Sequence, residues 1–333
     1  MDEYFVQAAT RRGGYLFRSD LLDLGLSDNG IRSAMREGLL VRIRHGTYAP
    51  SEPWRGLTPE EQHLLRANSI VDKLGPGVAL SHHTAVLAHG GTLWGVDLGR
   101  VHLTRLVSRA GRNEAGVVFH HARTDLDQDL TSIDGRPVTV PARAVLESCS
   151  LTRIEPAMVA ASFGIRAGLC TREELAELAQ QHRGWPGMLN VRLAARYAAP
   201  ECESVGEVRS MHLFRTHDVP LPECQVEVRI GGRLVARCDF GWWTWRHVGE
   251  FDGRIKYGRL NADPDHPEQS LVQEKLREDR VRSHPLGMTR WMWDDLAPSA
   301  RASTASRLRA DLERSRSLYG RTVIDLGRRP WVA

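Results

Sequence analysis

Three carboxylates and an amine lie within eighteen residues in the last third of this 333-residue chain. They are Asp239, Glu250, Asp252 and Lys256. Carboxylates held close together suit Mg²⁺, which binds a few acidic oxygens and keeps several waters for the nucleophile and the substrate phosphate. The bound metal then activates water and neutralises charge on the leaving oxygen. The cluster therefore predicts a metal-dependent site for phosphodiester hydrolysis, with Mg²⁺ or Mn²⁺ as the cofactor.

Two neighbouring strands are needed to bring these acids together. Residues 233–240 (RLVARCDF) and 245–251 (WRHVGEF) have the composition and alternation of strands, and we expect them to form a hairpin. Because side chains alternate across a strand, Glu250 and Asp252 share one face, and Asp239 on the neighbouring strand can meet them. An unpaired carboxylate in such an apolar strand is costly when it is buried. The group of acids is therefore a stronger sign of a site than any single member.

Two members of the cluster, Lys256 and Asp252, also have an alternative explanation. The chain has 45 Lys plus Arg, yet its only lysines are Lys73, Lys256 and Lys275. A compact ammonium differs chemically from a planar guanidinium, so a lysine kept beside an acidic cluster is a candidate for charge support. The alternative is that Lys256 is an exposed cation without a role. Asp252 followed by glycine is also an ordinary turn signal.

Residues 200–297 resemble the Vsr-like branch of the PD-(D/E)XK nuclease superfamily. The segments that carry the resemblance are CESVGEVRSMHLF, ARCDFGW, GEFDGRIKYGR and EKLREDRVRSHPLGMTRWMWDDL. The resemblance implies a restriction-endonuclease-like α/β domain whose helix acid is Glu203 or Glu207. It also implies that Asp239 is the first metal ligand and Glu250 the second, with Glu207 completing the set.

One position departs from the superfamily pattern. Asp252 stands where the superfamily usually carries lysine, so either Lys256 replaces the missing amine or the site is catalytically weak. Four cations follow on a predicted helix, Lys275, Arg277, Arg280 and Arg282. They could steady a nucleic-acid backbone or the scissile phosphate. Alternatively, they belong to a solvated helix face that is stabilised by i,i+4 ion pairs.

The amino-terminal residues predict three short helices and a hairpin. Ser19 and Ser27 are the expected N-caps of the second and third helices. The helices are expected over residues 2–12, 20–25 and 28–37, and the strands over residues 39–43 and 47–49. This order of elements predicts a winged helix-turn-helix.

Such a module reads DNA through its third helix and contacts the backbone with its wing. The expected DNA contacts are Asn29, Arg32, Ser33 and Arg36 on the helix and Arg42, Arg44 and His45 on the wing. Residues 15–50 (YLFRSDLLDLGLSDNGIRSAMREGLLVRIRHGTYAP) also resemble the amino-terminal domain of AbiEi-type antitoxins from abortive-infection toxin–antitoxin systems. Winged helices serve as protein-binding modules as well, so fold alone does not decide the partner.

The sequence patterns in the middle of the chain are less specific to one function. A proline-rich entry and a helix are expected within residues 51–74, a helix over 81–90 (SHHTAVLAHG), strands over 100–106 and 116–121, and a helix from Pro141 (VPARAVLE). This order is similar to the second domain of AbiEi-type proteins, so that resemblance spans about residues 1–180. Six histidines fall in this part: His82, His83, His89, His102, His120 and His121. No cysteine accompanies them at ligand spacing, and we expect structural histidines rather than a metal site.

Composition sets the broad class. The chain is 41% hydrophobic and has no apolar run long enough to span a membrane, and its charged start does not resemble a signal peptide. We therefore expect a cytoplasmic protein without a membrane partner. Five scattered cysteines without a CxxC pair indicate reduced thiols. The net charge of +4 is modest, so DNA binding would depend on where the cations lie.

The predicted fold is an α+β multidomain chain. Its expected parts are a winged helix-turn-helix over residues 1–52, an AbiEi-like α/β middle domain over 53–198 and a nuclease-like domain over 199–333. Three functional hypotheses follow. In the first, the winged helix delivers a Mg²⁺-dependent endonuclease to DNA. In the second, the protein is a non-catalytic transcriptional regulator or antitoxin, and the nuclease-like domain only binds DNA or a partner. In the third, the middle domain binds a toxin-like protein and DNA binding is autoregulatory.

Overall fold

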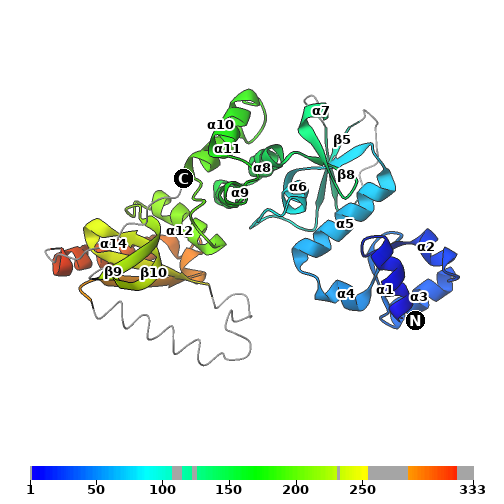
Figure 1. The fold of residues 1–333 in the computed structure, drawn as a ribbon, viewed down its shortest axis with the longest axis horizontal. Helices are drawn as coiled ribbons and strands as arrows, with labels where there is room; N and C mark the ends of the chain where they lie inside the picture. The colour runs from blue at the N-terminus through cyan, green and yellow to red at the C-terminus, as the bar shows by residue number, and fades with distance from the viewer. Residues whose placement is uncertain (1, 107–114, 122–125, 231–232, 254–283, 321–333) are drawn as a thin grey trace. The chain divides into compact units, whose positions relative to one another are not determined.

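The computed structural model describes residues 2–106, 115–121, 126–230, 233–253 and 284–320 (Figure 1). The chain divides into two compact units, Met1–Arg196 and Tyr197–Ala333. Within the described residues, helices accompany three separate sheets of three, four and five strands. The chain is therefore a mixed α/β protein with more than one structural unit.

The first unit begins with a small module of three helices and a three-stranded antiparallel sheet in the order β1-β3-β2. Its elements are α1 (Asp2–Arg11), β1 (Leu16–Phe17), α2 (Arg18–Asp23), α3 (Asp28–Arg36), β2 (Leu40–Arg44) and β3 (Thr47–Pro50). The helices follow from the apolar positions Phe5, Leu21 and Ile31, which are buried together with Leu16 and Tyr48 of the sheet. This shared core fixes which side of each helix faces solvent.

One of the two predicted N-caps is confirmed and the other is wrong. Ser27 caps α3, because its hydroxyl oxygen accepts a hydrogen bond from the Gly30 N–H at 3.1 Å. Ser19 lies inside α2 instead of preceding it. That helix follows β1 directly, and its first turn is closed by the Asp20 carboxylate, which accepts from the Phe17 N–H at 2.7 Å. The two-residue strand β1 was not expected from the sequence.

The rest of the first unit is a five-stranded sheet in the order β6-β5-β4-β8-β7 with helices around it (Figure 1). The strands are β4 (Val78–Leu80), β5 (Val101–Arg105), β6 (Val117–His121), β7 (Leu130–Ile133) and β8 (Arg136–Thr139). The helices are α4 (Ser51–Gly56), α5 (Pro59–Leu74), α6 (His82–Ala88), α7 (Leu126–Asp129), α8 (Pro141–Ser150), α9 (Ile154–Arg166), α10 (Arg172–Gln181) and α11 (Met188–Tyr197). The helices and strands predicted for residues 51–74, 81–90, 100–106 and 116–121, and the helix start at Pro141, are all present.

The second unit contains a four-stranded sheet in the order β12-β11-β10-β9. Its elements are α12 (Val205–Thr216), β9 (Glu223–Ile230), β10 (Arg233–Trp242), the 3₁₀ turn η1 (Trp243–Trp245), β11 (His247–Asp252), β12 (Gly287–Met292), the 3₁₀ turn η2 (Asp294–Leu296) and α14 (Arg301–Tyr319). Strands β9, β10 and β11 are antiparallel, and β12 runs parallel to β11. The predicted hairpin of β10 and β11 is confirmed.

Helix α12 lies unusually close to β11. A Cβ atom at Gly206 would lie 1.9 Å from Cε1 of Phe251, so only glycine fits at this point of the helix. On the same side of the sheet, the Trp291 indole N–H donates to the Ser210 hydroxyl at 2.7 Å. The ring of Trp291 stacks on Phe240, with centroids 5.4 Å apart. This packing fixes the helix that carries Glu207 against the strands that carry the other acids.

Candidate functional site

The first candidate surface is the outer side of α3. Ile31 and Ala34 are buried, with 3% and 4% of their surface exposed, and they hold the inner side of the helix in the core. Asn29, Arg32 and Arg36 are exposed, and together with Met35 they line one surface hollow. These residues follow one another at three- and four-residue intervals, which place them on one face of a helix. Three of the four residues predicted to contact DNA from this helix therefore lie together on its exposed face.

The fourth predicted helix contact, Ser33, is engaged within the helix. Its hydroxyl donates to the Glu37 carboxylate at 2.8 Å, and the Arg36 guanidinium approaches the same hydroxyl at 3.5 Å. The first turn of α3 carries an acid as well. Asp28 accepts two hydrogen bonds from Arg18, at 2.7 and 2.6 Å, and this pairing lowers the pKa of its carboxyl. Arg18 thereby offsets the one acidic charge at the start of this face.

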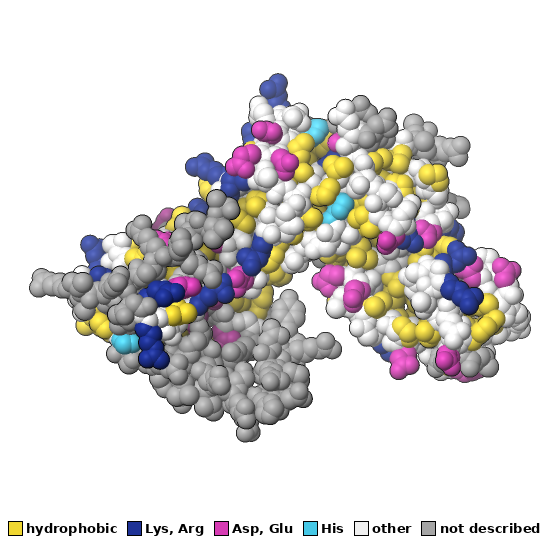
Figure 2. Space-filling model, viewed as in Figure 1, with side chains coloured by type: hydrophobic (Ala, Val, Ile, Leu, Met, Phe, Trp, Pro, Cys, Tyr) yellow, Lys and Arg dark blue, Asp and Glu magenta, His cyan; other side chains and the backbone are white. Residues whose placement is uncertain are grey.

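The hairpin of β2 and β3 carries the predicted wing contacts. Arg42 and His45 are exposed, whereas Arg44 is half-buried. The turn depends on Gly46, whose φ of 71° lies in the left-handed region. The pairing register shifts between Arg42 and Arg44, which is typical of a bulge. Figure 2 shows basic and acidic side chains interspersed on the visible face of this module.

The acid cluster lies where β10 and β11 separate. The ladder pairs Phe240 with Gly249 and does not continue to the next pair, Asp239 and Glu250. Instead, the Asp239 carboxylate accepts from the Phe251 N–H at 2.8 Å, in the place of a main-chain carbonyl. Alternation along both strands puts Asp239 and Glu250 on the same face of the sheet, as the sequence predicted.

Glu250 has a cation partner that the sequence did not indicate. Strand β12 runs parallel to β11 with Arg290 in register with Glu250, and the Arg290 guanidinium lies 2.6 Å from the Glu250 carboxylate. Glu250 is buried, with 7% of its surface exposed. Arg290 follows Glu250 by forty positions, so no local pattern could have revealed the pair. Asp252, the last residue of β11, is half-buried.

The two candidate helix acids differ in their surroundings. Glu207 is buried in the first turn of α12, where one carboxylate oxygen accepts from the Glu203 N–H at 2.9 Å and from the Gln225 amide at 2.7 Å. Glu203 is exposed and pairs with Arg237. Of the two, Glu207 is the one that the fold fixes in place.

The cations predicted for this site lie outside the described residues: Lys256, Lys275, Arg277, Arg280 and Arg282. Among the residues that the structure does describe, no three His, Cys, Asp or Glu side chains converge as a group that could hold a metal ion. The described part of the acid cluster is thus Asp239, Glu250 and Asp252, and Arg290 lies beside Glu250.

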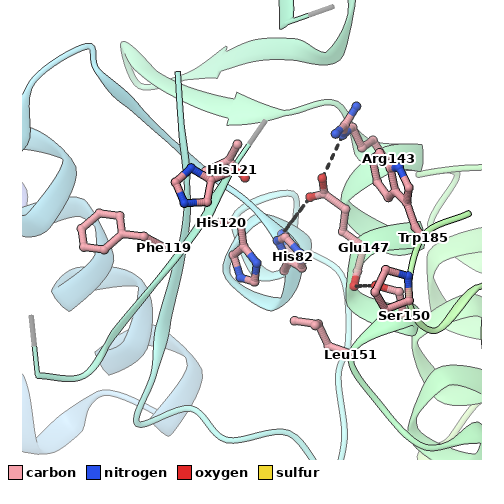
Figure 3. Close-up of a pocket in the computed structure, with 11 residues that line it drawn as sticks. His82, Phe119, His120, His121, Arg143, Glu147, Ser150, Leu151 and Trp185 are labelled. Atoms are coloured by element: carbon pink, nitrogen blue, oxygen red, sulfur yellow. Dashed lines mark hydrogen bonds and ion pairs between the residues drawn. The ribbon is translucent and has the colours of Figure 1, made fainter. Parts of the chain in front are cut away.

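A third candidate site is a cavity of about 280 Å³ in the first unit (Figure 3). The imidazoles of His82 and His120 stack beside it with centroids 3.6 Å apart, and Nδ1 of His102 lies 2.9 Å from Nε2 of His120. Further buried partners hold His83, whose Nδ1 lies 2.7 Å from the Ser148 hydroxyl, and His89, whose Nε2 lies 2.8 Å from the Thr139 carbonyl. Five of the six histidines thus have partners within the fold, whereas His121 is exposed, and the structural role stays a prediction.

Beside the histidines lies a buried ionic network. The Arg143 guanidinium donates to Glu147 at 2.8 Å and also pairs with Asp129. Nδ1 of His82 approaches the Glu147 carboxylate at 3.4 Å, but burial and the neighbouring imidazoles hold the pKa of His82 well below its usual value. His82 is therefore neutral, and Arg143 provides the charge that balances Glu147. Burial raises the pKa of Glu147. His82 also has a φ of 52°, a strained value for a residue other than glycine.

Comparison with known proteins bears on the amino-terminal module. Residues 6–51 match the family described as "Transcriptional regulator, AbiEi antitoxin". This match extends from within α1 through β3. The rest of the chain lies outside it, and no curated protein matches the chain. The amino-terminal module is thus similar to regulators of the AbiEi antitoxin type.

One solved structure is similar to the chain at a low level. It is described as the crystal structure of the RV2827C protein from Mycobacterium tuberculosis, with 17% sequence identity and a TM-score of 0.37. The match covers 62% of this chain and 78% of that chain. Likeness at this level carries no argument about fold or function. Among the described helices, none is both long and apolar enough to cross a membrane.

Proposed function

We propose that the protein is a DNA-binding transcriptional regulator of the antitoxin type, and that its amino-terminal module is a winged helix-turn-helix. This proposal is supported by two findings that fall in the same stretch of the chain. The antitoxin family match covers residues 6–51, and within that range Asn29, Arg32 and Arg36 share the exposed face of α3. The element order, with β1 pairing β3 and β2 beyond it, is compatible with a winged helix.

In this proposal α3 enters the major groove. A guanidinium can bind guanine through two hydrogen bonds, and an asparagine amide can bind adenine in the same way. Asn29 lies in the first turn of α3, where helix residues reach base edges, and Arg32 and Arg36 follow it in the middle and at the end of the same face. Arg42 and His45 on the hairpin contact phosphates and fix the register without reading the sequence.

Affinity measurements test this assignment. A DNA site is first selected from random duplexes with the full-length protein, and binding is followed by fluorescence anisotropy at fixed salt. Arg32→Ala should weaken binding by about 1–3 kcal/mol, or roughly 5- to 150-fold. Arg11→Ala, an exposed arginine at the end of α1, is the matched control and should leave the affinity unchanged. Equal affinities for wild type and Arg32→Ala would refute the contact.

A toxin-like protein is the partner proposed for the middle domain. The antitoxin match supports such a partner, and the proposal assigns the contact to the five-stranded sheet unit and not to α3. Co-purification with the product of a neighbouring toxin gene tests it, using a nucleotidyltransferase-like protein where one is encoded. Loss of the complex on deletion of residues 1–52 alone would contradict the assignment.

A second candidate function is metal-dependent phosphodiester hydrolysis by the second unit. The observation that favours it is the pair Asp239 and Glu250 on one face at the point where β10 and β11 separate. Magnesium commonly takes one or two protein carboxylates and completes its shell with water and substrate phosphate, so this pair fits it without a third acid. The ion would supply an activated water and charge neutralisation.

In that proposal Asp239, Glu250 and Arg290 each have a defined role. Asp239 is held by the Phe251 N–H, which donates to one of its carboxylate oxygens at 2.8 Å. Glu250 is held by Arg290, which keeps a buried carboxylate charge-balanced. Arg290 also places a guanidinium beside the acids, where phosphate would bind. Asp252 at the usual lysine position is the feature that favours a non-catalytic domain instead.

Plasmid cleavage decides between these two roles of the second unit. The full-length protein is incubated with plasmid and single-stranded DNA in Mg²⁺ or Mn²⁺, beside Asp239→Ala and Glu250→Ala. Cleavage by wild type that both variants lose supports a nuclease. Cleavage that persists in both variants, or that never appears in wild type, removes the nuclease proposal and leaves the regulator.

A further inference from the structure

Two cysteines meet beside the buried acid of α12. The Sγ atoms of Cys202 and Cys224 are 3.9 Å apart, and Sγ of Cys224 is also 3.9 Å from the Met211 sulfur. Cys202 lies in the turn before α12 and has 1% of its surface exposed, whereas Cys224, near the start of β9, is half-buried. We propose that Cys202 and Cys224 are a dithiol site that low-molecular-weight disulfides convert reversibly into an intramolecular disulfide.

The two thiols have different surroundings, which assign their roles. The contact with Cys224 and burial both raise the pKa of the Cys202 thiol, so Cys202 keeps its proton. A protonated Cys202 can donate its S–H to the Cys224 sulfur. Cys224 is also the more accessible of the two. Cys224 is therefore the cysteine that reacts first with the external disulfide, and Cys202 is the thiol that completes the reaction.

The chemistry is a pair of thiol–disulfide exchanges. The Cys224 thiolate attacks one sulfur of the external disulfide, whose S–S bond breaks, and one thiolate leaves with the bonding electrons. Cys202 then gives up its proton to a base and attacks the Cys224 sulfur of the mixed disulfide, which releases the second external thiolate. Both released thiolates take up protons. The external disulfide is reduced to two thiols, and the protein dithiol is oxidised to one disulfide.

Formation of the Cys202–Cys224 disulfide changes the surroundings of Glu207. The residues that follow the two cysteines, Glu203 and Gln225, both donate a hydrogen bond to the same oxygen of the Glu207 carboxylate, at 2.9 and 2.7 Å. Gln225 has a φ of 53°, so its backbone is already strained. A disulfide requires the sulfurs to approach to about 2.0 Å. Oxidation therefore changes the two donors of Glu207 together and ties the start of α12 to β9.

The site is tested on the full-length protein with glutathione as the probe. Reduced protein is equilibrated without oxygen in buffers of defined glutathione to glutathione-disulfide ratio, then acid-quenched, alkylated and analysed by intact mass and peptide mapping. We expect oxidised wild type to carry two fewer alkyl groups than the reduced protein and to yield a peptide cross-linked between Cys202 and Cys224. Dithiothreitol should reverse both changes.

Variants separate the two steps. Cys202→Ser should stop at a mixed disulfide of glutathione on Cys224, and Cys224→Ser should react at neither position. The buried thiols Cys149, Cys170 and Cys238 are internal controls that should remain alkylatable after unfolding. A wild-type protein that keeps glutathione on Cys224 without closing, that links a different pair, or that never oxidises at these positions overturns the proposal. Because wild-type mapping alone decides this, the result stands even where a serine variant fails to fold.

Discussion

Acidification should destabilise the first unit through its buried histidines. Burial lowers the pKa of His83 to about 4 and that of His102 to about 3. Nδ1 of His102 faces Nε2 of His120 at 2.9 Å, an arrangement that needs one donor and one acceptor. Protonation of both rings would leave two donors facing each other. The folded structure therefore favours neutral imidazoles, whereas the unfolded chain does not.

The sign and size of the effect follow from linkage. The pKa of an unfolded histidine is about 6.5, so the folded and unfolded chains bind protons equally above that pH. As the pH falls below about 6.5 the unfolded chain takes up protons first, and stability is lost until the folded pKa is reached. For His102, with a folded pKa of about 3, the loss at pH 5 is about 2 kcal/mol.

A substitution isolates this contribution. His102→Gln removes the titrating ring, so between about pH 7.5 and pH 5 it should lose roughly 2 kcal/mol less unfolding free energy than wild type. Unfolding of the first unit is followed in urea titrations by the extent to which hydrogen peroxide oxidises Met158. This side chain is buried when the unit is folded, so its oxidation reports on that unit alone. His45→Gln, at an exposed hairpin position, is the control and should retain the wild-type pH dependence. Identical pH dependence of wild type and His102→Gln would refute the reasoning.

Three further substitutions test the packing that supports the sites. Ser27→Ala should destabilise α3 by about 1 kcal/mol, seen as faster amide exchange in that helix, whereas Ser19→Ala, which removes no cap, should not. Gly206→Ala should lower stability by at least about 2 kcal/mol because its Cβ has no space, while Gly56→Ala, with open space around its Cβ, should be neutral or stabilising. Arg143→Met should cost about 3–5 kcal/mol because it leaves a buried carboxylate without its cation, as measured by urea midpoints; an unchanged midpoint would contradict the network.

Sequence reasoning succeeded where the determining interactions are local. The Ser27 cap depends on a contact three residues away, and the shared face of Asp239 and Glu250 follows from strand alternation. The outward side of α3 follows from the spacing of Ile31 and Ala34. Such features need only the periodicity of one element or a hairpin.

The remaining features depend on contacts between distant segments. Strand β1 has only two residues and exists because it pairs with β3, so no periodic pattern in the sequence predicts it. Arg290 reaches Glu250 only because β12 adds to the sheet in parallel with β11. The contact between Cys202 and Cys224 likewise joins the turn that precedes α12 to strand β9, which follows α12 in the chain. Ser19 was misassigned because Asp20 closes the first turn of α2 instead.

The central claim is that α3 reads DNA sequence while the hairpin contacts only the backbone. The most direct measurement compares the affinities of Arg32→Ala and Arg42→Ala for the selected site and for unrelated DNA at the same salt. Arg32→Ala should lower the ratio of specific to unrelated affinity by roughly tenfold, whereas Arg42→Ala should weaken both by a similar factor and leave the ratio unchanged. A ratio that Arg32→Ala leaves unchanged would contradict the account.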